Sequence, residues 1–117
     1  MTKIRDFIRG DTRLINIKFV QSDGVTPIDI TGGKVYFTVN ASNSPTDDTS
    51  IAFQKLVTSH TNPTQGQTQV KIVTGDTQNI APGVYYYDVE LVDSSGNVTS
   101  LKQDEFDINA DITRTNT

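Results

Sequence analysis

The sequence predicts an all-β sandwich, and three observations lead to this fold class. Thr, Val, Ile, Asn, Asp and Gly are plentiful, whereas Leu, Ala and Glu are scarce, a balance that favours strands and turns over helices. Apolar residues repeat with a period near two in several short segments, and no segment shows a long helical apolar period. Turn residues separate these segments at intervals typical of a sandwich. About seven strands therefore fit into a single domain over residues 1–117.

Alternation of apolar and polar residues defines each strand in order. In the first strand Ile15, Ile17 and Phe19 alternate with polar residues, although Leu14 breaks the strict pattern. The segment Ile51 to Val57 is irregular enough to predict an edge strand or a bulge. The predicted strands cover residues 13–20, 34–41, 51–57, 68–74, 84–91, 98–101 and 105–109.

Glycine, proline and aspartate mark the connections. Asp23-Gly24 and Pro27 supply turn geometry after the first strand, and Gly32 lies in a second tight passage. Polar loops at 42–50 and 58–67 flank the third strand, and the segment "DSSGN" closes a hairpin. We expect short extended tails at about 1–7 and 111–117.

The segment before Tyr85 narrows the fold. In immunoglobulin-like sandwiches a tyrosine near the start of the penultimate strand hydrogen-bonds back to the preceding corner. The stretch "DTQNIAPGVY" fits such a corner, with a helical turn that starts at Asp76 or Thr77 and ends at Pro82-Gly83. Tyr87 occupies the place of the antibody cysteine and can fill the space between the sheets. The predicted fold is an immunoglobulin-like antiparallel β-sandwich.

Composition disfavours several functions. Without cysteine the chain has no disulfide framework and no cysteine-based zinc site. Its 14 acidic and 10 basic residues give a net charge of −4, and no basic run could neutralise a series of phosphates, so nucleic acid is not an expected partner. No apolar stretch predicts a membrane span, and the charged start lacks the apolar core of a signal peptide. We therefore expect synthesis in a cytoplasm.

Few residues suggest chemistry. His60 is the only histidine and lies in a polar loop, where we expect it to be solvated. The acidic clusters Asp47-Asp48 and Asp104, Glu105 and Asp107 lack the spacing of a calcium loop, so solvation explains them more simply. The sequence thus predicts no catalytic, cofactor-binding or metal-binding residues, and no enzyme.

Three consecutive tyrosines must alternate across a strand. Tyr85 and Tyr87 are therefore predicted to face the core, whereas Tyr86 faces outward. Tyr86, with Tyr36 as a companion on an outer face, is an interface candidate because tyrosine is enriched at interfaces.

The tripeptide Arg9-Gly10-Asp11 matches the integrin-recognition motif, but it immediately precedes a strand in a chain with no recognisable route of secretion. In this position Gly10 can relax the backbone, and Asp11 or Thr12 can accept hydrogen bonds from neighbouring amides. We interpret the tripeptide as a turn.

Three segments in order resemble the immunoglobulin-like N-terminal domain of tailed-phage baseplate upper proteins and related virion proteins. They are "RGDT" at 9–12, the connection 23–32 and "GVYYYDV" at 83–89. The final strand differs, because "LKQDEF" replaces a glycine-containing turn of that family. The landmark residues are Arg9, Gly10, Asp11, Asp23, Gly24, Pro27, Gly32, Gly83, Tyr85, Tyr87 and Asp88.

The resemblance implies a non-catalytic structural protein of a tailed-phage virion, made in the host bacterial cytoplasm. A baseplate or tail component or adaptor would dock other phage structural proteins, as a homo-oligomer or in many copies of a symmetric assembly. The two tails would become ordered on assembly. The alternative is a capsid decoration or head-fibre anchoring protein. A carbohydrate-binding module is disfavoured, because the chain has no tryptophan and few outward aromatics.

Overall fold

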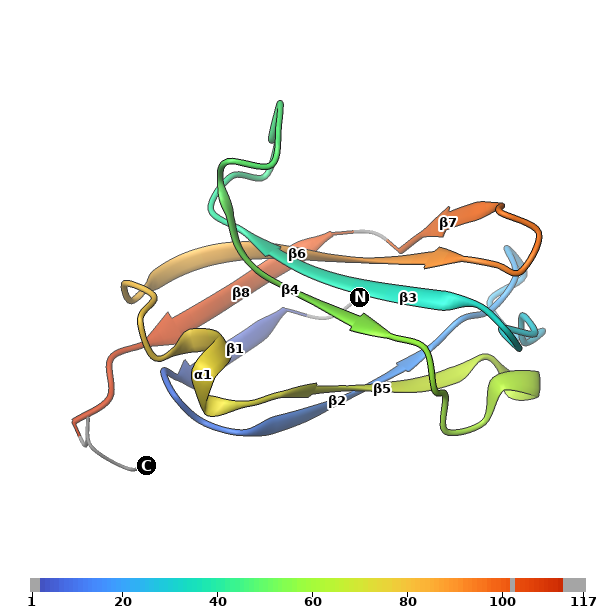
Figure 1. Cartoon of the computed structure of the whole chain (residues 1–117), viewed down its shortest axis with the longest axis horizontal. Helices are drawn as coiled ribbons and strands as arrows, with labels where there is room; N and C mark the ends of the chain where they lie inside the picture. The colour runs from blue at the N-terminus through green and yellow to red at the C-terminus, as the bar shows by residue number, and fades with distance from the viewer. Residues whose placement is uncertain (1–2, 102, 113–117) are drawn as a thin grey trace.

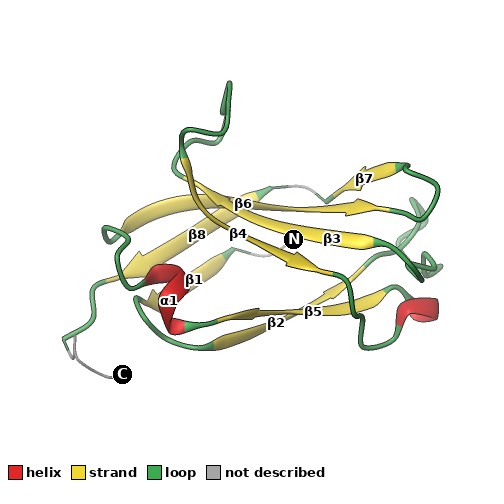
Figure 2. Ribbon diagram, in the orientation of Figure 1, coloured by secondary structure: helices red, strands yellow, loops and turns green. Residues whose placement is uncertain are grey.

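Eight strands form two stacked sheets within residues 3–101 and 103–112, the part of the chain that the computed structural model describes (Figures 1 and 2). The large sheet contains β1 (Ile4–Ile8), β3 (Lys34–Asn40), β4 (Ile51–Val57), β6 (Gly83–Val92), β7 (Val98–Ser100) and β8 (Asp104–Asn109). The small sheet contains β2 (Arg13–Lys18) and β5 (Gln67–Ile72). Two short helical turns are η1 (Pro63–Gln65) and α1 (Thr74–Thr77). The prediction of an all-β sandwich is confirmed.

The strand order shares its central part with an immunoglobulin-like sandwich, although β1 and β4 both join the large sheet. The large sheet runs β1-β8-β6-β3-β4, with β7 also paired to β6, and its pairs are antiparallel except for β1 beside β8. Strands β2 and β5 pair antiparallel in the other sheet. In immunoglobulin domains the third, sixth and seventh strands likewise share one sheet, and the second and fifth share the other. Two strands, β7 and β8, here take the place of a single seventh strand.

An aromatic cluster fills the space between the sheets. The Phe106 ring contacts four others, among them Phe7 at 5.2 Å and Tyr87 at 6.1 Å between ring centroids. Tyr87 also stacks on Phe37 at 5.3 Å. Burial raises the pKa of Tyr87 to about 12, with a smaller contribution from the charge of Asp104. Each fully buried aromatic contributes roughly 1.5–3 kcal/mol through removal of apolar surface from water.

The N-terminal segment is a strand rather than the expected tail. Phe7 is fully buried, and β1 pairs with β8 from Ile4 to Ile8. The strand escapes sequence reasoning because its register shifts between Ile4 and Phe7, where Asp6 has φ 55°. This irregularity breaks the period of two on which strand prediction depends. At the other end residues 111 and 112 are described, and residues 113–117 of the expected tail lie outside the described residues.

The Arg9-Gly10-Asp11 segment turns the chain from β1 in the large sheet to β2 in the small one. The Gly10 amide donates to the buried Oγ1 of Thr77 at 2.7 Å, and Gly10 adopts φ 87°. Arg9 Nε lies 2.8 Å from Oδ1 of Asp111 in an ion pair, with the Arg9 side chain only 15% exposed. Its Nη1 donates to the carbonyl of Ile80 at 3.1 Å. The Arg9 guanidinium is therefore bound by two groups of the protein itself, the Asp111 carboxylate and the Ile80 carbonyl.

Asp11 does not have the expected capping role. Its side chain is exposed and accepts no hydrogen bond from the described residues, although its backbone amide donates to Ile8 O at 3.0 Å. Thr12 is also exposed, without a capping hydrogen bond from the described residues. Arg9 and Gly10 hold the turn instead, because their partners lie on distant segments that the local sequence does not reveal.

The second landmark segment connects β2 to β3 and folds around its own aspartates. Asp23 accepts hydrogen bonds from the hydroxyl and amide of Thr26 and from the amide of Val25, and these bonds lower the pKa of the Asp23 carboxyl. Gly24 and Gly32 both have φ 75°, which favours glycine. Pro27 forms an isolated bridge with Val20.

That connection packs against Gly66, which sequence reasoning did not single out. Gly66 has φ 71°, and a Cβ added there would lie 2.4 Å from Phe19 O and 2.7 Å from Ile28 O. The Gly66 carbonyl accepts the amide of Phe19 at 2.8 Å. Only glycine fits this close approach of three segments. We call Arg9, Gly10 and Thr77, which hold the turn from β1 to β2, the joint residues.

The third landmark contains the predicted tyrosine corner. Tyr85 Oη donates to the Ala81 carbonyl at 2.6 Å, just before β6. The helical turn α1 begins at Thr74, earlier than predicted, and Gly83 opens the strand. Asp88 lies further along β6, on its outer face.

Candidate docking groove

The outer face of the large sheet carries a groove whose floor is built by β3 and β6. Every second residue of these strands enters the core, which leaves the intervening residues on the outer face. The register sets the outward residues in three rows: Tyr36 with Glu90, Thr38 with Asp88, and Asn40 with Tyr86. Strand β4 continues the middle row, where Gln54 Nε2 donates to Thr38 Oγ1 at 2.9 Å.

The loop 41–50 forms one wall of the groove. It projects from the large sheet on the side away from β2 and β5 (Figure 1). At its base Asn40 Oδ1 accepts the Ser42 amide at 2.9 Å and the Ser50 hydroxyl at 2.7 Å. Gln103 Nε2 donates to the Asn43 carbonyl at 3.2 Å, which fastens the loop to the segment between β7 and β8. These bonds give the wall a defined shape.

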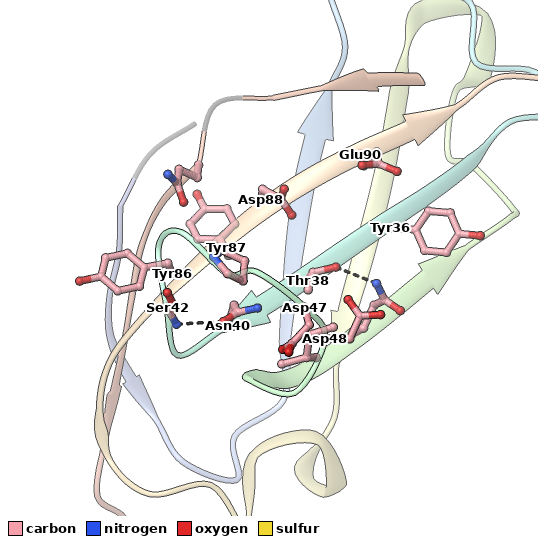
Figure 3. Close-up of a pocket in the computed structure, with 14 residues that line it drawn as sticks. Tyr36, Thr38, Asn40, Ser42, Asp47, Asp48, Tyr86, Tyr87, Asp88 and Glu90 are labelled. Atoms are coloured by element: carbon pink, nitrogen blue, oxygen red, sulfur yellow. Dashed lines mark hydrogen bonds between the residues drawn. The ribbon is translucent and has the colours of Figure 1, made fainter. Parts of the chain in front are cut away.

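The groove has a volume of about 310 Å³, and the charged side chains that line it in the described part of the chain are all acidic. Asp88 and Glu90 follow β6, and Asp47 and Asp48 come from the loop (Figure 3). Among the described residues, no lysine, arginine or histidine lines it. The described part of the groove therefore presents four carboxylates.

Two of these carboxylates have different environments. Asp47 Oδ1 accepts the hydroxyl of Thr49 at 2.6 Å and its amide at 3.0 Å, and these bonds lower the pKa of the Asp47 carboxyl. Asp88 has no hydrogen bond or ion pair with any described residue, and burial raises the pKa of its carboxyl. Among the described residues the partly desolvated charge of Asp88 has no partner, and its burial costs folding free energy.

Tyr36 and Tyr86 lie toward opposite ends of the groove (Figure 3). Both are half-buried, and neither hydroxyl is hydrogen-bonded within the described part of the chain. The structure therefore brings the two sequence-predicted interface tyrosines to one site. Sequence reasoning assigned Asp47 and Asp48 to solvation and missed Glu90. The alternation of β6 already placed Glu90 beside Asp88, but only the fold places the loop next to them.

His60 is half-buried rather than solvated. Its Nε2 lies 2.8 Å from the Gly33 carbonyl, and its Nδ1 lies 2.8 Å from Oγ1 of the buried Thr68. Because a carbonyl only accepts, Nε2 carries a proton. The ring thus ties the loop after β4 to the start of β3.

In residues 3–101 and 103–112, no group of three His, Asp or Glu side chains is placed to hold a metal ion. No helix in that part of the chain has the length and apolar character needed to cross a bilayer.

No protein family model, curated protein or solved structure gives a significant match to this chain.

Proposed function

We propose that this chain is a non-catalytic docking module of a tailed-phage virion, a baseplate or tail component or adaptor that binds other structural proteins of the particle. The observation that carries the docking role is the outer-face groove. It combines two half-buried tyrosines with four carboxylates on a hydrogen-bonded sheet. Half-buried tyrosines in a concave site are typical of recognition surfaces.

The assignment to a phage particle rests on the three landmark segments and on where they lie. The segment 9–12 forms the crossover between the sheets, the segment 23–32 packs on Gly66, and the segment 83–89 holds the tyrosine corner. Motifs at such positions preserve a fold, which supports a resemblance at the level of the domain. A non-catalytic role is further supported by His60, whose two ring nitrogens are engaged in structural contacts.

Several copies in a symmetric array are part of the proposal. Strand β4 ends the large sheet on one side, and the exposed Leu56 lies on its outer face next to Tyr36. An edge strand offers unpaired backbone groups to a neighbour.

The test is the composition of purified particles of the phage that encodes the chain. Quantitative mass spectrometry against the major capsid protein is expected to find the chain in tens of copies or fewer. Hundreds of copies would instead identify a capsid decoration protein. Absence of the chain from particles that remain infectious would refute the virion role.

A further inference from the structure

We infer that the groove binds an extended, arginine- or lysine-bearing segment of a partner protein. This inference deepens the proposed docking function and rests on it. The shape of the groove, its charge and the placement of its tyrosines all favour such an occupant.

The shape suits an extended chain. The three outward rows run from Asn40 to Tyr36 along β3, four residue steps that span about 13 Å of strand. Loop 41–50 borders one side, and its base is fixed by Asn40 and Gln103. An extended segment of about four residues fits along this floor.

The charge selects a cationic occupant. A neutral ligand would cover the carboxylates of Asp88 and Glu90 without replacing their lost hydration, which is unfavourable. A divalent ion needs several oxygens at one point, and the described residues offer no such cluster. Nucleic acid would be repelled by four carboxylates. Each basic side chain of a bound segment can pair with one of these carboxylates. The backbone of that segment can then follow the groove.

The tyrosines favour arginine over lysine. A guanidinium is planar, pairs with a carboxylate through two parallel hydrogen bonds and stacks on aromatic rings. Tyr36 lies directly across from Glu90, so one guanidinium can reach both a ring and a carboxylate. Tyr86 is two residues from Asp88 on the same face of β6 and offers a second such pair.

The experiment is an NMR titration of the ¹⁵N-labelled full chain with the blocked peptide acetyl-Gly-Arg-Gly-Arg-Gly-amide. The amide signals of β3 and β6 in the groove are expected to shift. A peptide with citrulline in place of arginine keeps the shape and loses the charge, so it is expected to bind roughly tenfold more weakly. Equal binding of the two peptides, or shifts spread over acidic residues elsewhere, would overturn the inference.

A pair of variants isolates the groove from net charge. Asp88→Asn is expected to weaken the arginine peptide roughly threefold to tenfold, because it removes one partner of the cation. Asp11→Asn makes the same charge change at an exposed side chain without a hydrogen bond in the described part, and it should leave the affinity within about twofold because salt screens distant charges. Equal weakening by both variants would refute a specific site. Melting curves of both variants check that they are folded.

Two further probes test the other occupants, and particle analysis separates the two proposals. Maltohexaose or calcium chloride that shifted the groove signals in place of the arginine peptide would overturn the cationic-segment inference.

If particles contain the chain but the peptide does not bind, only the groove inference fails. If the peptide binds but particles lack the chain, the virion role fails.

Discussion

The joint residues and the groove use polar groups in opposite ways. At the joint, the amide of Gly10 and the buried hydroxyl of Thr77 satisfy each other at 2.7 Å, and Arg9 is paired with Asp111. In the groove, Asp88 has no partner among the described residues, and burial raises the pKa of its carboxyl. Polar groups at the joint therefore stabilise the fold, whereas burial of the Asp88 carboxylate costs stability and leaves this group available for a ligand.

The loop aspartates resemble the joint. Asp23, Asp29 and Asp93 accept hydrogen bonds from amides or hydroxyls a few residues further along, and each has a lowered carboxyl pKa. Asp47 belongs to this class although it lines the groove. Comparison with Asp88 shows that the residue type does not decide the role, because nearby hydroxyl and amide donors determine whether a carboxylate is hydrogen-bonded within the fold.

The largest effect is expected from Gly66→Ala, which should lower the free energy of unfolding by about 3 kcal/mol or more. The new Cβ would overlap two backbone carbonyl oxygens, and alanine would be strained at φ 71°. Chemical denaturation measures the loss. Gly24→Ala is the matched control, since Gly24 has φ 75° but no atom within 4 Å of the added Cβ. Equal losses would show that backbone strain alone, and not close packing, selects glycine.

Thr77→Val is expected to destabilise the protein by about 1–3 kcal/mol, because it leaves the buried Gly10 amide without its acceptor. Thr77→Ser keeps the hydroxyl and removes only a methyl group. The serine variant should therefore unfold at a higher denaturant concentration than the valine variant. The reverse order would mean that packing, rather than the hydrogen bond, holds the corner.

Arg9→Met should cost about 1 kcal/mol through loss of the ion pair with Asp111 and the bond to the Ile80 carbonyl. Asp11→Ala, two residues away in the same tripeptide, should change stability by less than about 0.5 kcal/mol, because its side chain is exposed. Thermal melting of both variants makes the comparison. A larger loss for Asp11→Ala would restore the capping role that the sequence suggested.

The smallest effect, and one of opposite sign, is expected in the groove. Asp88→Asn should raise stability at pH 7 by less than about 0.5 kcal/mol. The folded-state pKa of Asp88 lies above its ordinary value of 3.8, so the native state binds more protons and loses stability as pH rises through that window. The gain in melting temperature from Asp88→Asn should therefore be larger at pH 7 than at pH 4.

Asp47→Asn provides the opposite pH dependence. The folded-state pKa of Asp47 lies below 3.8, so its stabilising contribution is present above that pH and is lost as pH falls through the folded-state value. The variant should melt below the parent protein at pH 7 and approach it in acid. If the melting temperatures of Asp88→Asn and Asp47→Asn changed with pH in the same way, the distinction between carboxylates with and without internal hydrogen bonds would be contradicted.

Local sequence patterns predicted most of the strands and the two tyrosines of the groove. Alternation placed Tyr87 inside and Tyr36 and Tyr86 outside, and the corner motif identified Tyr85. Sequence-based prediction failed where the period of two is broken, as in β1. It also failed where the role of a residue depends on a neighbour that is distant in the sequence. Nothing near Gly66 in the sequence reveals the carbonyls of residues 19 and 28 that exclude a side chain there.

The sequence by itself determined which residues of each strand enter the core, because side chains alternate with a period of two whatever the strand pairs with. Only the tertiary structure decided which outward residues meet. Pairing of β3 with β6 set Tyr36 beside Glu90 and Thr38 beside Asp88, and the chain reversal after Asn40 brought Asp47 and Asp48 to the same groove. These contacts join segments tens of residues apart, so they follow from strand order and register rather than from any local pattern.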